Sequence, residues 1–389
     1  MLIKSLIRRL SINNMADKAK RPRLHSMKEK SYFESYCDIS VHEEMLGDGE
    51  RTNAYKKAIF SCRDAISGKV VLDVGAGTGI LSCFCAQVGA AKVYAVEASK
   101  IAKQAEKVVE HNGLQDRVQV IHGVMEEVNL PEKVDIIVSE WMGYCLLYES
   151  MLSSVIWARD KWLKPGGLML PDHATIFVAP VCDDEVMVEK VNFWNDMDEV
   201  YGVDMACLIP FARESLAKEV MVKCIGGESV LSHEQTVAKL DLYTVTTDDL
   251  SLVQYKFSFK CFGIADLQGF SVWFDVKFSG HDVSTYKLAC NGDKKDSQSN
   301  NHTKNSVILS TSPFKPETHW KQSILYLDNE VAVQQDSDIS GKIQLRPEKY
   351  NPRFLSITLD TKIDDGEMIC KKYSMGYELP KADVSALES

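Results

Sequence analysis

Three glycines, Gly75, Gly77 and Gly79, stand in the segment Val71–Ser82, where an apolar run ends and a helical pattern begins. A strand that turns through glycines into a helix brings the backbone close to a nucleotide-like ligand, because glycine has no side chain to hold the ligand off. The spacing is GxGxG, whereas a dinucleotide-binding turn follows GxGxxG, with its third glycine one residue later. The turn therefore predicts a cofactor site for a ligand other than a dinucleotide.

Acidic residues around this turn indicate which cofactor it takes. Glu97 ends the next apolar run, about twenty residues after the glycines, where a carboxylate can accept hydrogen bonds from both ribose hydroxyls. Asp73 would support the turn or bind a cofactor ammonium group, and Glu126 would meet an adenine amino group or simply face solvent. S-adenosylmethionine fits because it has no phosphate. We therefore expect S-adenosylmethionine as cofactor, with S-adenosylhomocysteine as by-product, bound by Asp73, Gly75, Gly77, Glu97 and Glu126.

A second pair of acidic residues, Glu140 and Glu149, brackets the apolar and aromatic segment Trp141–Tyr148. Glu140 closely follows the apolar run Val134–Val138, and ligands of open α/β sheets bind beyond the carboxyl ends of the strands. Two carboxylates are unusual beside so apolar a surface loop. We expect this loop to form the site of the second substrate.

Short apolar runs alternate with helix-length segments between residues 69 and 181, a pattern typical of β-α-β units around a mostly parallel sheet. The segment Ile101–Val109 has helical spacing, with Ser99 as its expected N-cap and Asn112-Gly113 as its stop. The runs expected as strands are Val70–Val74, Val93–Val96, Val118–Ile121, Val134–Val138 and Leu168–Val178.

After about Pro171 the pattern changes to strict alternation, as in Leu252–Cys261 and Phe270–Phe278. Alternation with a period of two indicates antiparallel strands that place one face on a core. We therefore expect an all-β domain over 173–375, a barrel or a sandwich. It would follow a first domain over 31–172, made of N-terminal helices and a Rossmann-like cofactor-binding unit.

The segment Glu185–Ala212 within the second domain has a helical pattern and many large apolar side chains. A single domain has no obvious need for such an arm, and large exposed apolar surfaces mark interaction sites. We expect this arm, at about 185–212, to pack on a second subunit and form a homodimer.

Three polar or basic segments are expected outside the packed domains: a disordered tail at 1–30, an exposed loop at 290–305 and a tail at 376–389. The basic and partly apolar start of the chain lacks the cleavage site of a signal peptide. The basic cluster Lys18–Arg23 could serve as a nuclear import signal or be part of a solvated tail. We expect a nuclear location, with the cytoplasm as the alternative.

Charge and cysteine usage exclude several classes of function. The chain has 45 Lys and Arg against 55 Asp and Glu, a net charge of −10, which disfavours general nucleic-acid binding and favours basic partners. The eleven cysteines form no CxxC pair, so we expect neither a disulfide framework nor a metal site. The apolar runs are far shorter than the ~20 residues of a membrane span, so we expect no membrane partner.

The segment SEWMGYCLLYES, residues 139–150, resembles the double-E loop of protein arginine methyltransferases, and Thr318–Trp320 resembles their THW loop. Residues 31–36 and 41–46 resemble the N-terminal helices of the same family. The segments STSPFKPETHWKQSILYL and YGVDMACL are similar to the type I subfamily numbered six. The likeness extends from Tyr32 to about Pro380, and it implies a Rossmann-like domain followed by a β-barrel with a helical dimerisation arm.

The resemblance also implies roles for individual residues. Glu140 and Glu149 would clamp a substrate guanidinium, and His319 would accept a proton or organise the site, paired with Asp48 or with a water. Arg51 would hold the cofactor carboxylate. Further cofactor contacts would come from Tyr32, Tyr36, His42 and Met45, and further substrate contacts from Met151 and Trp320.

A purely structural role remains an alternative for several of these residues. Tyr32 and Tyr36 share a helix face, which suits a lid over the cofactor or core packing equally. His42 lies in an expected capping box, Ser40–Glu43, and its role could be limited to packing at the helix start. Met45 and Met151 resemble the methionines that line the acceptor channel of the family and restrict the space for the methylated product. Methionines in such places otherwise simply fill gaps in the packing.

The physical chemistry agrees with the resemblance. A guanidinium stays protonated at any working pH and is a poor nucleophile, and the methyl donor is itself a cation. Two carboxylates offset the repulsion: at ~4 Å and an effective dielectric constant near ~20, each contact contributes roughly 4 kcal/mol before desolvation. Bidentate pairing also determines which nitrogen points at the methyl group.

The sequence thus favours a type I protein arginine methyltransferase that forms monomethyl and asymmetric dimethyl arginine in histone tails and Arg/Gly-rich proteins, with roles in chromatin and transcription implied by the resemblance. A small-molecule or nucleic-acid methyltransferase is one alternative, disfavoured because neutral acceptors need no dicarboxylate clamp. A catalytically inactive scaffold is another, disfavoured by the intact site residues. Cys145 and Tyr148 depart from the family's loop, which leaves substrate preference open.

Overall fold

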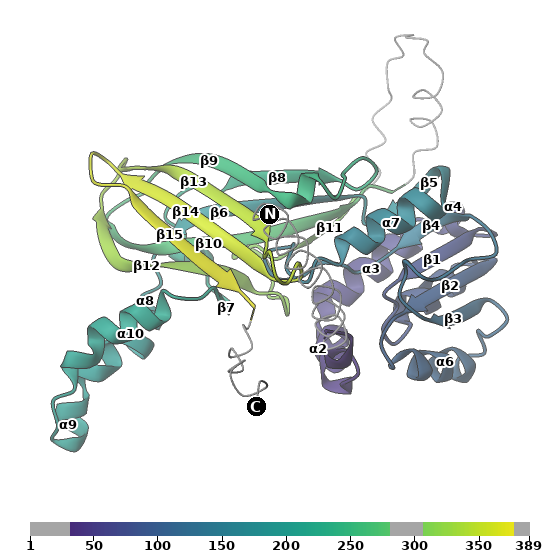
Figure 1. Cartoon of the computed structure of the whole chain (residues 1–389), viewed down its shortest axis with the longest axis horizontal. Helices are drawn as coiled ribbons and strands as arrows, with labels where there is room; N and C mark the ends of the chain where they lie inside the picture. Colours follow the sequence, from purple (N-terminus) through teal and green to yellow (C-terminus); the bar gives the residue numbers. More distant parts are fainter. Residues whose placement is uncertain (1–31, 281–305, 377–389) are drawn as a thin grey trace, which may run out of the picture.

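The computed structural model describes residues 32–280 and 306–376. It contains a parallel α/β unit and an antiparallel β unit that pack side by side (Figure 1). The expected tail at 1–30, the expected loop at 290–305 and the C-terminal tail from 377 onward lie outside the described residues. A helical turn at 32–35 is followed, before the first sheet, by the helices α2 (Ile39–Gly47), α3 (Gly49–Ser61) and α4 (Arg63–Ile66).

The first sheet has five parallel strands in the order β3-β2-β1-β4-β5. Its central strands are near-continuous apolar runs, as expected for strands that helices cover on both faces. The chain reverses direction across the sheet between β1 and β4, which is where ligands bind in such folds. The strands are β1 (Val70–Val74), β2 (Lys92–Glu97), β3 (Val118–His122), β4 (Val134–Val138) and β5 (Leu163–Leu170), and the helices are α5 (Ile80–Gln87), α6 (Ala102–His111) and α7 (Leu152–Trp162).

Two sequence expectations for this unit need correction. The run Leu168–Val178 is not one strand, because the chain leaves the first sheet at Leu170 and enters the second at His173. Its apolar residues are continuous, so hydrophobicity alone did not show that two sheets divide them. The N-cap position of α6 is Ile101, and the hydroxyl of Ser99, two residues earlier, accepts a hydrogen bond from the Ile101 N–H at 3.4 Å.

The second unit consists of a sheet in the order β7-β12-β10-β6-β8, with β11 paired to β10, and a four-stranded sheet in the order β15-β14-β13-β9. Rings of Phe257 and Phe259 from β9 meet Phe270 from β10, at 5.3 and 6.4 Å between centroids, so the core lies between the sheets. This arrangement confirms the expected Rossmann-like domain followed by an antiparallel β domain. Its strands are β6 (His173–Val181), β7 (Met221–Lys223), β8 (Gln235–Asp241), β9 (Val253–Lys260), β10 (Ala265–Phe278), β11 (Val307–Ser310), β12 (Gln322–Val333), β13 (Asp338–Pro347), β14 (Leu355–Ile363) and β15 (Ile369–Met375).

The predicted arm projects from the β unit (Figure 1). It is helical but broken, and it ends at Leu216 rather than at Ala212, so the expectation of a continuous helical pattern over 185–212 is corrected. Gly202, with φ of +71°, ends the middle helix. The pieces are α8 (Asp184–Val186), a π turn (Met187–Val191), a 3-10 turn (Asn192–Asn195), α9 (Met197–Tyr201), a second 3-10 turn (Ala206–Leu208) and α10 (Ile209–Leu216).

Buried aromatic side chains join the two units. The Tyr55 ring of α3 packs on Phe278 at 4.9 Å between centroids, and its hydroxyl donates to the carbonyl oxygen of Ser139 at 2.9 Å. The Trp320 indole N–H, from the β unit, donates to the carbonyl oxygen of Met142 at 2.8 Å. The β unit therefore supports the loop that follows β4. Over residues 32–280 and 306–376, no helix has the length and apolar character to span a membrane.

Candidate active site

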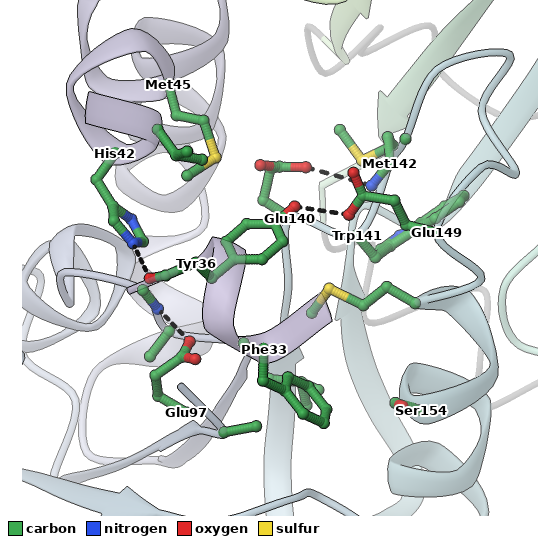
Figure 2. Close-up of a pocket in the computed structure, with 18 of the residues that line it drawn as sticks. Phe33, Tyr36, His42, Met45, Glu97, Glu140, Trp141, Met142, Glu149 and Ser154 are labelled. Carbon is green, nitrogen blue, oxygen red and sulfur yellow. Dashed lines mark hydrogen bonds between the residues drawn. The ribbon is translucent and has the colours of Figure 1, made fainter. Parts of the chain in front are cut away.

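A cavity of about 250 Å³ lies at the carboxyl edge of the parallel sheet. The N-terminal helices, the glycine turn, the double-E loop and the β unit all contribute to its wall, and Figure 2 shows Glu97 at one end and Glu140 with Glu149 at the other. The described residues contain no group of three or more His, Cys, Asp or Glu placed to hold a metal ion. The predicted site residues that line the cavity are Tyr32, Tyr36, His42, Met45, Arg51, Gly75, Gly77, Glu97, Glu126, Glu140, Glu149, Met151, His319 and Trp320.

The glycine turn has a backbone that side chains would disrupt. Gly75 and Gly77 have φ of +72° and +55°, in the left-handed region. A Cβ at Gly75 would lie 2.1 Å from the Met151 Cε atom, and a Cβ at Gly77 would lie 3.4 Å from the His42 ring. The left-handed backbone therefore favours glycine at both positions, and at Gly75 an added Cβ would also displace the end of the Met151 side chain.

Glu97 is held by backbone amides at the end of β2. Its carboxylate accepts hydrogen bonds from the N–H groups of Gly77 at 2.8 Å and Ser99 at 2.7 Å. These bonds fix the carboxylate beside the glycine turn, where the sequence placed it.

His42 is buried and faces the same turn. Its Nε2 donates to the carbonyl oxygen of Tyr36 at 2.9 Å. The expected capping box at Ser40–Glu43 is wrong, because α2 starts earlier: Asp38 is the N-cap and accepts from the Ser40 N–H at 3.0 Å. His42 thus lies in the first turn of α2, binds the carbonyl oxygen of Tyr36 and also lines the cavity beside Gly77.

Asp73 lies beneath the turn and does not line the cavity. One carboxylate oxygen accepts from the Ser82 hydroxyl at 2.7 Å, and within the described structure the other is buried without a hydrogen-bond partner. Burial raises the pKa of Asp73 to about 7. Of the two roles expected from sequence, support of the turn through α5 is the one that these contacts show.

Glu140 is paired with Arg51 from α3. The Arg51 Nη2 and Nε atoms lie 2.8 and 3.1 Å from Glu140 Oε2, and both side chains are more than nine-tenths buried. Glu140 Oε1 accepts from the Met142 N–H at 3.2 Å. The resemblance implies that Arg51 holds the cofactor carboxylate; in this structure its guanidinium contacts Glu140 and donates to the carbonyl oxygen of Met45 at 3.1 Å. The ion pair offsets part of the cost of burying two charged side chains.

The Glu149 carboxylate is held by two tyrosine hydroxyls. Its Oε2 accepts from the hydroxyls of Tyr36 at 2.6 Å and Tyr32 at 2.9 Å. Burial raises the pKa of Glu149, and the nearby negative charge of Glu140 adds to the rise, while the tyrosine hydrogen bonds oppose it. Figure 2 shows both carboxyl groups directed into the same part of the cavity, as the predicted clamp requires.

The double-E loop carries backbone strain. Four of its non-glycine residues have positive φ: Cys145, Leu146, Glu149 and Ser150. Each such conformation costs on the order of 1–3 kcal/mol and persists only where the surroundings impose it. The direction of the Glu149 side chain therefore depends on what holds this loop.

His319 is paired with Asp48, the N-cap of α3. The His319 Nδ1 lies 2.7 Å from Asp48 Oδ2, which also accepts from the His319 backbone N–H at 2.8 Å. Burial alone would raise the pKa of Asp48, but the hydrogen bonds from His319 and from the Arg51 N–H lower it. An ionised Asp48 keeps the proton on Nδ1 and makes Nε2 the basic nitrogen of the ring.

The remaining predicted residues differ in exposure. Met45 and Met151 are half-buried in the cavity wall, and Glu126 is exposed and accepts from the Ser154 hydroxyl at 2.7 Å. Trp320 is almost fully buried, and its indole N–H binds the double-E loop at Met142. Its contacts are those of a residue that supports the loop, beside any contact with substrate.

Sequence reasoning missed Arg353 and Phe33, which also line the cavity. Arg353 lies between β13 and β14, about two hundred residues from the loop it contacts, and donates to the Glu149 carbonyl oxygen at 2.8 Å. Nothing in the local pattern around it marks a site. Phe33 directly follows Tyr32, and its place in the N-terminal helical turn was the available signal.

Comparisons with known proteins match both units. Residues 71–167 match a family model described as a methyltransferase domain, and residues 172–366 match the arginine methyltransferase oligomerization subdomain. Protein arginine N-methyltransferase 6 of Danio rerio is 48% identical over 93% of this chain and 96% of its own length. A probable protein arginine N-methyltransferase 6.1 of Oryza sativa is 45% identical over 89% of this chain and 88% of its own length.

Solved structures show the same likeness. The Trypanosoma brucei PRMT1 enzyme-prozyme heterotetrameric complex with AdoHcy covers 88% of this chain and all of the matched chain, with a TM-score of 0.74 and 34% identity. A structure of PRMT6 with SAH covers 84% of this chain and all of the matched chain, with a TM-score of 0.66 and 29% identity. The resemblance that the sequence motifs indicated is confirmed.

The raised pKa of Asp73 predicts how stability depends on pH. Asp73 keeps its carboxyl proton up to about pH 7 in the folded state, whereas an unfolded aspartate loses it near pH ~4. The stabilisation of the folded state by this proton is therefore complete below pH ~4 and is lost as pH rises through about 7. The Asp73→Asn variant cannot titrate there. We expect the loss of unfolding free energy between about pH 5 and 8 to shrink by on the order of 2 kcal/mol in this variant, measured by denaturant titration. An equal loss in both proteins would contradict the assignment.

Proposed function

This chain belongs to the protein arginine methyltransferase family, and from that premise we propose that it is a type I enzyme acting on histone tails and Arg/Gly-rich proteins. Its products would be monomethyl and asymmetric dimethyl arginine. The observation that carries the proposal is the pair Glu140 and Glu149, which face one cavity together with the glycine turn and Glu97.

The cavity fits S-adenosylmethionine. Gly75 and Gly77 bring backbone without side chains to the cavity wall, and the Glu97 carboxylate beside them accepts the Gly77 N–H. When bound, the cofactor supplies a methyl group on a cationic sulfur. The two methyltransferase structures described above hold its demethylated product, AdoHcy or SAH. We propose that the glycine turn, Glu97 and the N-terminal aromatic residues bind it.

Glu140 and Glu149 would bind and orient the substrate guanidinium. A guanidinium placed between them adds a positive charge beside Glu149 and lowers the pKa that burial has raised. Charge drawn toward the nitrogens that contact the carboxylates leaves the third nitrogen a usable lone pair, and bidentate pairing points that nitrogen at the methyl group.

Proton removal is the second task of the site. The nitrogen that forms the new N–C bond must lose one proton, since it starts from a protonated guanidinium. His319, held by Asp48 through Nδ1, offers a basic Nε2 in the cavity wall. We assign His319 as the proton acceptor and Asp48 as the group that fixes its tautomer.

Methyl transfer to arginine is tested with labelled S-adenosylmethionine and a histone-tail peptide, beside the same peptide with Arg→Lys. We expect label on the arginine peptide alone, because the single nitrogen of lysine lacks the planar fork that the carboxylates orient and has no lone pair while it is held as an ammonium. Mass spectrometry of the product should show monomethyl and asymmetric dimethyl arginine, in keeping with Met45 and Met151 in the channel wall. Label on both peptides, or a symmetric dimethyl product, would contradict the proposal.

The arm supports a homodimer. Its exposed apolar side chains have no core of their own to enter, and the residues match an oligomerization subdomain. The base of the arm is fixed by Asp183, which accepts from the Tyr326 hydroxyl at 2.5 Å and pairs with Lys223 at 3.0 Å. The large apolar side chains of the arm that are more than half exposed are Val188, Val200, Tyr201, Val203 and Phe211.

Charges placed on the arm should separate the dimer. We expect Tyr201→Glu combined with Phe211→Glu to weaken self-association by about 100-fold, because two large aromatic side chains are lost from a buried interface. Analytical ultracentrifugation measures the change. Phe262→Glu is the matched control, since Phe262 is an exposed aromatic residue of the β unit outside the arm. A dimer that Phe262→Glu weakens as much as the arm variant does would place the interface elsewhere.

We further propose a nuclear location and a role in chromatin and transcription. The basic cluster Lys18–Arg23 and the acidic net charge, which favours basic tails as partners, support it. The cluster lies outside the described residues. Alanine at its lysines and arginines should move a fluorescent fusion from the nucleus to the cytoplasm, and an unchanged distribution would contradict the proposal.

A further inference from the structure

The turn between β13 and β14 holds the double-E loop at Glu149. The Glu149 N–H donates to the Arg353 carbonyl oxygen at 2.7 Å, and Arg353 Nη1 donates back to the Glu149 carbonyl oxygen at 2.8 Å. The next pair of residues adds a third bond, from the Ser150 hydroxyl to the carbonyl oxygen of Pro352. Two distant segments are thus joined residue by residue.

These bonds fall where the loop backbone is least favourable. Glu149 and Ser150 have φ of +75° and +55°, a region that residues with side chains rarely adopt. The bonds to Arg353 occupy both backbone polar groups of Glu149, so they fix the peptide planes on either side of its Cα. The direction of the Glu149 side chain follows from those planes.

Arg353 also supports the groups that bind the Glu149 carboxylate. Its guanidinium carbon lies 3.7 Å from the centroid of the Tyr32 ring and 5.3 Å from that of Phe33. Tyr32 in turn donates its hydroxyl to Glu149 Oε2 at 2.9 Å. One side chain therefore stabilises Glu149 by two routes, through its backbone and through its tyrosine partner.

We propose that Arg353 is a positioning residue for methyl transfer, which sets the direction in which the Glu149 carboxylate meets the substrate guanidinium; this role rests on the proposed function. Arginine suits the task because its planar group can donate a hydrogen bond in its plane and stack on an aromatic ring at the same time. A lysine ammonium has no flat face to stack and carries its charge at one point.

Arg353 also acts on the charge of Glu149. Burial and Glu140 raise the pKa of Glu149, and the positive charge of Arg353 opposes them. Removing that charge should therefore raise the pKa, so that the clamp loses its ionised form at a higher pH. The charged or titratable groups that interact with Glu149 are Tyr32, Tyr36, Glu140, Tyr144 and Arg353.

The test compares Arg353→Met, Arg353→Lys and the control Lys349→Met, which removes a positive charge from the same turn. For Arg353→Met we expect kcat/KM for an arginine peptide to fall about 100-fold, as for a misplaced catalytic group, and the acidic limb of its pH profile to move to higher pH. Arg353→Lys should keep the limb in place and recover only part of kcat/KM. Lys349→Met should match the unaltered enzyme.

Calorimetry with S-adenosylhomocysteine shows whether the variants keep a folded cofactor site, and we expect its Kd to change no more than a few-fold. Full recovery of kcat/KM in Arg353→Lys would overturn the proposal, because neither the planar group nor the stack would then matter. An unshifted acidic limb in Arg353→Met, with a loss of activity that follows its loss of thermal stability, would also overturn it. Absence of transfer to the arginine peptide by the unaltered chain would instead refute the proposed function.

Discussion

Two carboxylates that lie close together in a buried cavity repel each other and lose their hydration, and the rest of this site follows from how that cost is met. The protein treats the two differently. Glu140 forms a direct, buried ion pair with Arg51, whereas the Glu149 carboxylate accepts hydrogen bonds from the hydroxyls of Tyr32 and Tyr36 and keeps a raised pKa although Arg353 lies nearby. The Glu149 carboxylate is therefore the one that still needs a positive charge to compensate its burial. A guanidinium supplies that charge, and a neutral acceptor would leave the cost in place.

This constraint explains why residues from the whole chain meet at one point. A glutamate at the end of a strand is positioned by the sheet, but Glu149 lies in a loop whose backbone needs outside support. The N-terminal helical turn provides the hydroxyls, and the β unit provides Trp320 against Met142 and Arg353 against Glu149. Docking of the two units is thus part of the site and not only a means of burying surface. The Tyr55 contact with Phe278 belongs to the same docking surface.

The features that sequence predicted are those with local patterns. Apolar runs marked β1 to β4, and glycines with a following acid marked the cofactor turn at Gly75 and Glu97. Features set by tertiary packing were missed or misjudged. The run Leu168–Val178 belongs to two sheets, and the arm is broken into short helical pieces. Neither feature changes the spacing of apolar residues, so the sequence pattern did not reveal them. The role of Arg353 could not be predicted from the sequence, since it arises from a contact with a loop about two hundred residues away in the chain.

The most direct test of the account is calorimetric binding of an arginine peptide to the enzyme saturated with S-adenosylhomocysteine, with Glu149→Gln as the variant. Glutamine keeps the shape of the side chain but removes the charge that the guanidinium meets. The account predicts that peptide affinity falls by roughly 10- to 100-fold, the effect of losing a charge-assisted hydrogen bond, while affinity for S-adenosylhomocysteine stays nearly the same. Equal losses of both affinities, or an unchanged affinity for the peptide, would contradict it.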